Sequence, residues 1–200
     1  MNLLAFDTSS ETLSVAAARE GKILAEGNFS ADTRHSEHLV ATLESIVKKA
    51  GWRPKDIDCI AVGVGPGSFT GLRVGVMTAK VLAYALGKKL VGVSSFEAVA
   101  RAADFRGRMA VLLDAKRGNV YAGVYEKKGA FFKTLEKPRL ATKDEVLKRS
   151  PRVLVVGGAV FPRASFIAEA AWPLIQKKKF NDPFTLEPLY LRPRDCNVHV

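Results

Sequence analysis

The chain opens with short apolar runs that are separated by polar turns. Runs at 3–7, 13–18, 23–29, 59–64 and 90–93 each predict a strand, because each is short and bounded by turn-forming residues. Between 36 and 50 the apolar residues recur at helical spacing, with Ser36 as a candidate cap and Gly51 as a terminator. The segment 65–75 leads into a second helix that we expect to reach about residue 86, and 96–103 predicts a third.

The second half repeats the order in which the first half opens. A strand at 109–113 ends in Asp114, a turn follows at 116–119, and 120–125 predicts the return strand before a turn at 127–129. Thr142 is a candidate cap for a short helix, 153–156 predicts a strand, 164–171 predicts a helix, and the tail from 177 is expected to be irregular. Two lobes are predicted, an N-terminal lobe at 1–104 and a smaller, basic lobe at 105–200.

Composition is that of a folded protein in a reducing compartment. Apolar residues make up 48% of the 200 positions, enough for a core, and the two cysteines, Cys59 and Cys196, are too few for a disulfide framework. The first residues lack the basic and apolar regions of a signal peptide, and no unbroken apolar run reaches the roughly 18 residues of a membrane span. We expect a soluble, cytoplasmic protein.

The net charge of +11 is concentrated in the second half. Residues 1–100 carry 11 Lys and Arg against 10 Asp and Glu, whereas residues 101–200 carry 20 against 10. Such asymmetry indicates either a contact with nucleic acid or an acidic partner, for which Lys177, Lys178 and Lys179 are candidates, or a solvated basic surface. Aromatic residues do not interleave with these cations, so a sequence-specific RNA-recognition module is not indicated.

Two aspartate-bearing hairpins are candidates for a nucleotide cleft. Asp7, Thr8 and Ser9 form the first, Asp114 opens the second, and Gly157-Gly158 resembles an adenosine loop. Phosphate approaches backbone N–H groups closely only where side chains are absent, yet the first hairpin has no glycine and the second has one. The chemistry of independent ATP hydrolysis is therefore mostly missing, and Asp7 can equally be a turn residue that accepts backbone hydrogen bonds.

The segment Gly65-Pro66-Gly67-Ser68-Phe69-Thr70-Gly71-Leu72-Arg73-Val74-Gly75 fits neither a P-loop nor Gly-x-Gly-x-x-Gly, and Ser68 or Thr70 can cap the helix that it opens. Small residues then recur every fourth position, at Gly71, Gly75, Ala79 and Ala83. Glycine inside a helix costs about 1 kcal/mol relative to alanine, so this stripe predicts close approach of another element. Packing against the helix at 36–50 and a contact between subunits are both compatible with the spacing.

No group of residues indicates a metal or a nucleophile. His35 and His38 have a spacing that zinc ligands use, but a site needs three or four ligands, and exposed or helix-capping histidines explain them as well. Neither cysteine has a histidine or second cysteine near it in the sequence. We expect neither a metal nor a cofactor.

Several segments resemble signatures of the TsaB (YeaZ) family over nearly the whole chain. The most specific is the segment 65–75. The others are Phe6-Asp7-Thr8-Ser9, Arg34-His35-Ser36-Glu37, Gly92-Val93-Ser94-Ser95-Phe96-Glu97-Ala98, Asp114-Ala115-Lys116-Arg117-Gly118-Asn119-Val120-Tyr121 and Pro188-Leu189-Tyr190-Leu191-Arg192. The resemblance and the repeated opening imply an α/β protein of the actin/Hsp70/sugar-kinase (ASKHA) fold with a trimmed second lobe.

The resemblance also implies a role without catalysis of its own. TsaB is similar to TsaD, which transfers a threonylcarbamoyl group onto N6 of adenosine 37 in tRNA and carries a metal-binding His-x-x-x-His. The matching positions here are Ser95 and Val99, neither of which suits such a metal. We therefore expect a dimerisation and activating subunit with no catalytic residue. The alternatives are a weak ASKHA ATPase or kinase and a glycoprotease-like (M22) metallopeptidase.

Partners follow from the same resemblance. The first lobe is expected to form a heterodimer with TsaD and, through the same surface, a homodimer, with the ATPase TsaE docking on the heterodimer and tRNA bound through the complex. The candidate interface residues are Gly71, Arg73, Gly75, Ala79 and Ala83. One surface for both partners is reasonable if the homodimer contact is isologous.

Overall fold

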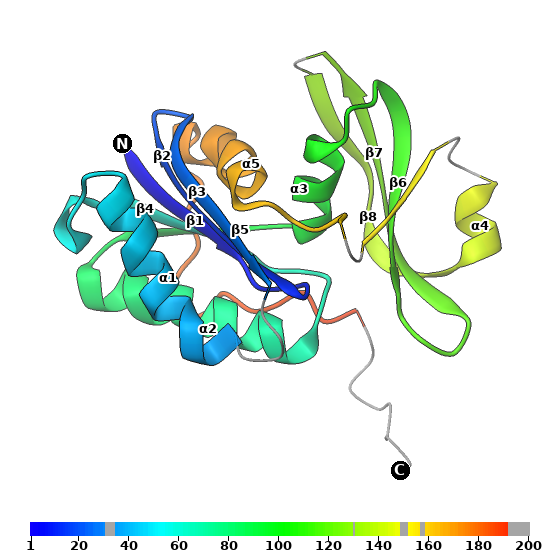
Figure 1. Ribbon diagram of the computed structural model, residues 1–200. Coiled ribbons are helices and arrows are strands. Elements are labelled where there is room, and N and C mark those ends of the chain that lie inside the picture. Colours follow the sequence, from blue (N-terminus) through cyan, green and yellow to red (C-terminus); the bar gives the residue numbers. More distant parts are fainter. Residues whose placement is uncertain (31–34, 130, 149–151, 157–158, 192–200) are drawn as a thin grey trace, which may run out of the picture.

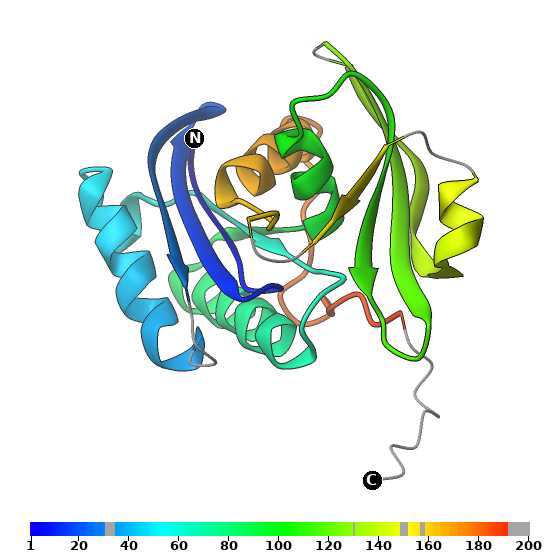
Figure 2. The same cartoon turned by 45° about the vertical axis from the view of Figure 1, so that its right-hand side comes forward.

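The computed structural model describes residues 1–30, 35–129, 131–148, 152–156 and 159–191. Within these residues, two β-sheets alternate with helices in layers, as two views of the ribbon show (Figure 1, Figure 2). Helices α1 and α2 cover the outer face of the first sheet, α5 and α3 lie between the sheets, and α4 covers the far face of the second sheet.

The first sheet has the strand order β3-β2-β1-β4-β5. Strands β1, β2 and β3 form an antiparallel meander, and β4 and β5 continue from β1 in parallel. The elements are β1 (Asn2–Asp7), β2 (Thr12–Arg19), β3 (Lys22–Ser30), α1 (His35–Lys49), a 3-10 turn η1 (Pro54–Asp56), β4 (Cys59–Gly63), α2 (Phe69–Leu86), β5 (Lys89–Val93) and α3 (Ser95–Ala102).

The second sheet repeats the opening of the first, with the order β8-β7-β6-β9, and among the described residues it has no strand in the place of β5. Its meander is antiparallel, and β9 pairs with β6 in parallel. The elements are β6 (Gly107–Asp114), β7 (Asn119–Lys128), β8 (Phe131–Thr142), α4 (Lys143–Leu147), β9 (Val153–Val155) and α5 (Ala164–Gln176). The repeated order and the shorter second sheet confirm the predicted ASKHA fold with a trimmed second lobe.

Alternating side chains of the central strands supply different core layers. In β1, Leu4 and Phe6 pack toward α1 and α2, whereas Leu3 and Ala5 pack toward α5. This explains why the central strands read as unbroken apolar runs, since both of their faces are covered by helices. Strand β6 repeats the arrangement between α3 and α4.

One strand and part of one helix were missed by the sequence patterns. Strand β8 lies at the edge of the second sheet and contains Pro138, which an edge strand tolerates because one side of its backbone is not paired. Helix α5 continues past the predicted end at 171 to Gln176, with Pro173 inside it. Ser68 and Thr142 accept hydrogen bonds from the Gly71 and Glu145 N–H groups, as expected of caps.

The chain returns to the first sheet after the second is complete. Helix α5 packs on the first sheet, the Asn181 N–H donates to the Leu90 carbonyl at 2.8 Å, and the Leu189 N–H donates to the Val64 carbonyl at 2.8 Å. Leu186 lies in the core layer between the first sheet and α2. The division of the chain into lobes at 1–104 and 105–200 stays a prediction. The segment that follows α5 packs with the first sheet.

Candidate functional site

The turn between β1 and β2 holds a fully buried carboxylate. The Ser9 N–H and hydroxyl both donate to Oδ1 of Asp7 at 2.7 Å, and the Ser95 hydroxyl donates to Oδ2 at 2.6 Å. Thr8 is buried as well, and its hydroxyl donates to the Gly71 carbonyl at 2.7 Å. The side-chain oxygens of Asp7, Thr8 and Ser9 and the Ser9 N–H are thus engaged with the protein itself.

Glycines of β4 and α2 surround this turn. A Cβ at Gly71 would collide with the Thr8 carbonyl, and a Cβ at Gly75 would collide with the Thr8 hydroxyl. In the same way, a Cβ at Gly63 would collide with the Asp7 carboxylate, and a Cβ at Gly67 would collide with the Ser9 carbonyl. The start of α2 can therefore lie directly on the turn only because these positions lack side chains.

This packing corrects the expected placement of the small-residue stripe. Gly71, Gly75, Ala79 and Ala83 are all buried, so they face the interior of the protomer rather than a partner. The glycines contact the turn at Thr8, which neither interpretation of the spacing had foreseen. Of the candidate interface residues, only Arg73 lies on the exposed side of α2.

The two positions that match the TsaD metal ligands have structural roles here. The Ser95 hydroxyl donates to Asp7 and also accepts from the Gly65 N–H at 3.0 Å, and Val99 packs in the apolar layer between α3 and the second sheet. Across the described residues, no three His, Cys, Asp or Glu side chains are grouped as metal ligands would be. His38 is exposed on α1, while the side chain of His35 and the whole of His199 lie outside the described residues.

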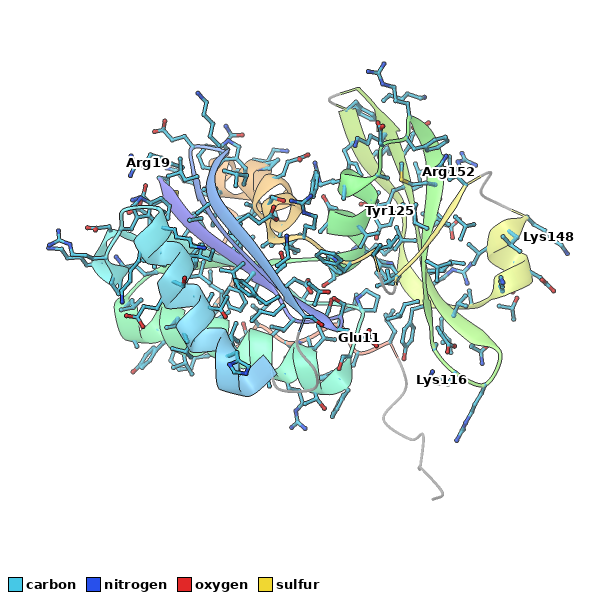
Figure 3. The ribbon with its side chains drawn as sticks, in the orientation of Figure 1. Glu11, Arg19, Lys116, Tyr125, Lys148 and Arg152 are labelled. Atoms are coloured by element: carbon cyan, nitrogen blue, oxygen red, sulfur yellow. The ribbon has the colours of Figure 1, made fainter. Side chains whose placement is uncertain are left out.

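The second aspartate is not joined to the first in one site. Asp114 is exposed at the start of the β6–β7 hairpin, accepts from the Lys116 N–H at 2.8 Å and forms an ion pair of 3.0 Å with the Lys116 ammonium. Lys116 marks this hairpin and Glu11 the β1–β2 turn on the same side of the molecule (Figure 3). Gly157 and Gly158 lie outside the described residues.

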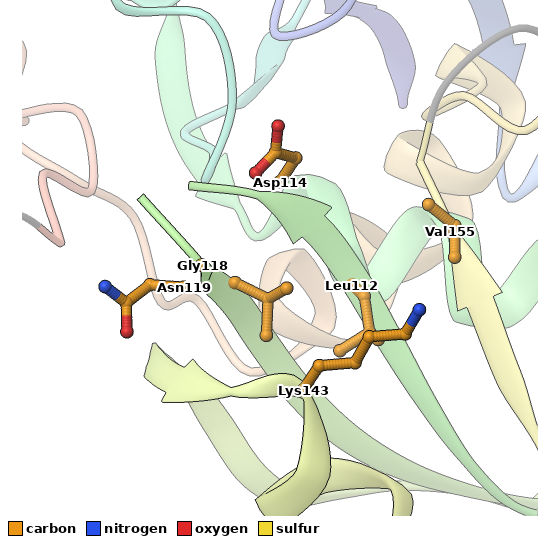
Figure 4. A pocket seen from close by; sticks show the side chains of 7 residues that line it. Leu112, Asp114, Gly118, Asn119, Lys143 and Val155 are labelled. Atoms are coloured by element: carbon orange, nitrogen blue, oxygen red, sulfur yellow. The ribbon is translucent and has the colours of Figure 1, made fainter. Parts of the chain in front are cut away.

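A small pocket lies beside Asp114 in the second lobe (Figure 4). It measures about 300 Å³ and is lined by Leu112, Asp114, Gly118, Asn119, Val120, Lys143 and Val155. Its lining does not include Asp7, Thr8 or Ser9 of the first predicted hairpin. It offers one carboxylate and one ammonium on an otherwise largely apolar wall, which is no cradle for a triphosphate.

The described cysteine is poorly suited to nucleophilic chemistry. Cys59 is buried in β4, and burial raises the pKa of its thiol to about 12. A thiol with such a pKa carries almost no thiolate at neutral pH, which is the reactive form. Cys196 lies outside the described residues.

The exposed face of α2 carries large apolar side chains that sequence reasoning overlooked. We call Phe69, Arg73, Met77, Val81 and Tyr84 the α2 outer face. Its four apolar members are between 56% and 68% exposed. The spacing of about four residues places them in one row opposite the buried stripe, and a survey of large as well as small residues along this helix would have found them. Contiguous exposed apolar surface of this kind marks contact sites.

The last described segment adds aromatic rings to this face. Tyr190 packs against Phe69 with ring centroids 5.4 Å apart, and Phe184 packs edge-on against Tyr84 at 5.2 Å. The Arg73 guanidinium lies over the Phe69 ring at 5.1 Å. The Lys80 ammonium donates to the Leu186 carbonyl at 3.0 Å and so fixes the segment beside the helix.

Helix α2 is also long and apolar enough to cross a membrane by length and composition, with a mean hydropathy of 1.2 over residues 69–86. In the structure it belongs to the folded core, since Leu72, Val76 and Ala79 are buried against the first sheet. Its apolar character is thus divided between an inner face that packs and an outer face that is exposed.

Lys177, Lys178 and Lys179 are exposed where α5 ends. They are far along the chain from the first sheet, yet the bridge between Leu90 and Asn181 places them at the edge where β5 begins. The structure therefore places these cations beside the first sheet.

Comparisons with known proteins agree with this architecture. Residues 29–161 match the family model for TsaD, the tRNA N6-adenosine threonylcarbamoyltransferase. The tRNA threonylcarbamoyladenosine biosynthesis protein TsaB of Bacillus subtilis is 36% identical over 162 residues, which cover 78% of this chain and 71% of that protein. TsaB of Escherichia coli is 32% identical over 130 residues, and the match spans 64% of this chain and 56% of that protein.

A solved structure extends the similarity to the whole fold. YeaZ from Pseudomonas aeruginosa superposes with a TM-score of 0.83 at 25% identity, covering 95% of this chain and 99% of that chain. Three of the segments that carry the sequence resemblance lie at the β1–β2 turn, the start of α2 and the start of α3, where the buried carboxylate network is built. By sequence, with agreement in fold, this chain belongs to the TsaB family of tRNA threonylcarbamoyladenosine biosynthesis proteins.

Proposed function

We propose that the chain serves tRNA threonylcarbamoyladenosine synthesis as a non-catalytic partner subunit, which pairs with a TsaD-type transferase through the α2 outer face. The observation that carries the proposal is the exposure of Phe69, Met77, Val81 and Tyr84 in one row, extended by Phe184 and Tyr190. Aromatic residues, methionine and arginine are the residue types enriched at the centres of protein interfaces.

The buried network at Asp7 supports a role without catalysis. A carboxylate that must hold a metal or contact phosphate cannot do so while Ser9 and Ser95 donate to both of its oxygens in a closed space. Replacement of the two TsaD metal positions by Ser95 and Val99 points the same way. These observations favour a partner subunit over the ATPase and metallopeptidase alternatives.

The similarity of this chain to the TsaD family model supports the choice of partner. Two related lobes can meet face to face in the manner of an isologous contact, so the same surface suits a homodimer as well. Docking of TsaE, binding of tRNA through the complex and a cytoplasmic location stay predictions.

The pairing is tested with Met77→Glu and Val81→Glu, measured by co-purification with the cognate TsaD-type protein and by isothermal titration. Both side chains are more than half exposed, so the substitutions should leave folding intact while each weakens pairing at least tenfold. Leu147→Glu is the matched control, because Leu147 is 49% exposed on α4 in the second lobe. Unchanged pairing in both α2 variants would rule out this face as the contact.

A further inference from the structure

The end of the molecule where β1, β4 and β5 begin collects positive charge from five separate segments. We call the following residues the basic end: Arg19, Lys22, Lys48, Lys49, Arg53, Lys55, Lys88, Lys89, Lys177, Lys178 and Lys179. All are exposed except the half-buried Lys88. Arg19 is visible there, beside the start of β1 and away from the β1–β2 turn that Glu11 marks (Figure 3).

The topology explains why these residues meet. Strands β1, β4 and β5 are parallel, so their first residues share one edge, which β2 reaches as it ends at Arg19. Helices α1 and α2 precede β4 and β5, and therefore end at the same edge. Gly21 approaches Trp172, which brings the end of α5 to the β2–β3 turn.

Contacts between the segments confirm that they form one surface. The Arg19 guanidinium lies 5.7 Å from the centre of the Trp52 ring, and the Lys88 ammonium donates to the Lys55 carbonyl at 2.8 Å. The Lys89 ammonium lies 5.6 Å from the centre of the Phe180 ring, immediately after the three lysines. The basic end is therefore continuous from the β2–β3 turn, past η1, to the end of α5.

Carboxylates at this end do not balance the cations. Glu44 pairs with Lys48 at 2.7 Å, Asp56 pairs with Arg53 at 3.5 Å, and Glu20 lies 3.8 Å from the N-terminal ammonium. Asp58 accepts from the Asn2 N–H, and Asp182 accepts from the Phe184 N–H. Five carboxylates thus stand against eleven Lys and Arg side chains, and each carboxylate already has a local partner.

Helix ends account for only part of this charge. Cations at the carboxyl ends of α1, α2 and α5 interact favourably with the helix dipoles, which is reason enough for some of these lysines. Arg19 and Lys22 instead flank a hairpin turn, and Arg53 and Lys55 belong to the η1 segment. A polyanion neutralised by many separated cations explains the whole set, and phosphates along a nucleic-acid backbone are such a polyanion.

We propose that the basic end binds the phosphate backbone of RNA, as the tRNA-contacting surface of this subunit. The inference rests on the proposed function, since a subunit of a tRNA-modifying assembly meets RNA as its polyanion. The α2 outer face ends at Tyr84, close to the basic end, so a partner held on α2 would sit beside the bound RNA. Contact with an acidic protein segment is the competing outcome.

The test measures fluorescence anisotropy of a labelled tRNA transcript with the full chain and its TsaD-type partner over a series of salt concentrations. We compare Lys177→Glu/Lys178→Glu/Lys179→Glu with Lys22→Glu/Lys49→Glu/Lys55→Glu, which changes the same charge on other segments of the basic end. The matched control is Lys133→Glu/Lys137→Glu/Lys148→Glu, three exposed lysines of the second lobe.

Both basic-end variants should raise the Kd about tenfold or more and reduce the slope of log K against log salt by about 2, as expected when about three phosphate contacts are lost. The control should change either quantity far less. Equal losses in all three variants would overturn the proposal in favour of general net charge, and no loss in the basic-end variants would overturn it outright.

Pairing with the TsaD-type protein is measured on the same samples by light scattering. This measurement distinguishes failure of the proposed pairing from failure of the proposed RNA binding. The basic-end variants should pair with the TsaD-type protein as wild type does, and loss of pairing without loss of tRNA binding would assign the basic end to an acidic protein partner. Failure of wild type to pair, with tRNA binding intact on the isolated chain, would overturn the proposed function alone.

Discussion

Ser95 donates a hydrogen bond of 2.6 Å to Asp7, a residue 88 positions away in the chain. The bond joins the end of β1 to the first turn of α3, and therefore joins the first sheet to the helix on which the second sheet packs. A buried polar contact therefore holds together two segments that are far apart in the sequence.

Removing the hydroxyl should destabilise the protein. Ser95→Ala removes the Ser95 donor from one oxygen of a buried carboxylate, and the loss of such a hydrogen bond costs about 1–3 kcal/mol of unfolding free energy. Urea unfolding followed by circular dichroism measures the loss. Ser45→Ala, at an exposed position of α1, is the control. Equal midpoints for the two variants would show that the Asp7–Ser95 bond contributes nothing.

Close packing of α2 on the β1–β2 turn gives a second prediction. Gly75→Ala places a methyl group against the Thr8 hydroxyl, and overpacking of this kind costs about 1–3 kcal/mol. Adding Thr8→Ala removes the colliding oxygen. The double variant should therefore lose less unfolding free energy than the sum of the losses in the two single variants. If the losses of unfolding free energy in the two single variants simply add in the double variant, the contact between Gly75 and Thr8 is contradicted. Gly75→Leu should fail to fold rather than block pairing selectively.

The central strands were predictable because both of their faces are buried, which leaves continuous apolar runs at β1, β4 and β6. Strand β8 was not, because an edge strand needs no such run: its residues are mostly exposed or half-buried, and Pro138 interrupts it. Pattern and turn residues thus specify the interior of a sheet better than its edges.

The site was harder to predict than the fold because spacing along a helix does not say which face is covered. The stripe at Gly71 and Gly75 needs a close neighbour, as its spacing predicts, and that neighbour is the turn at Thr8, 63 residues before Gly71 in the chain. Leu186 shows the same limit, since its place in the first core depends on where the chain returns.

Acid should weaken the protein partly through Glu26. Burial alone would raise the pKa of this carboxyl, but hydrogen bonds from Arg163 and Ser165 outweigh burial and lower the pKa below its usual value of 4.5. A lowered folded-state pKa contributes stability that is present above the unfolded-state value and is lost as pH falls through the folded-state value. Unfolding free energy should therefore fall as the pH drops through 4.5 toward the lowered folded-state pKa of Glu26.

The variant Arg163→Met tests this assignment. It removes the first of the donors while Glu26 stays partly buried, so the fall of stability with acid should be shallower than in wild type. Chemical unfolding at a series of pH values measures the slope. An unchanged slope would show that the Glu26–Arg163 pair, which fixes β3 to the start of α5, does not contribute to the acid dependence.

Two neighbours in the last described segment should separate folding from pairing. Leu186 is 9% exposed in the first core, so Leu186→Ala should cost about 2–4 kcal/mol of stability and weaken pairing only through unfolding. Phe184 is 72% exposed and touches Tyr84, so Phe184→Ala should leave stability nearly unchanged while it weakens binding to the TsaD-type partner by several-fold. Thermal unfolding and isothermal titration on both variants give the two readouts. If Phe184→Ala pairs as wild type does, the contact is confined to the helix, and the segment after α5 only anchors the chain to the first sheet.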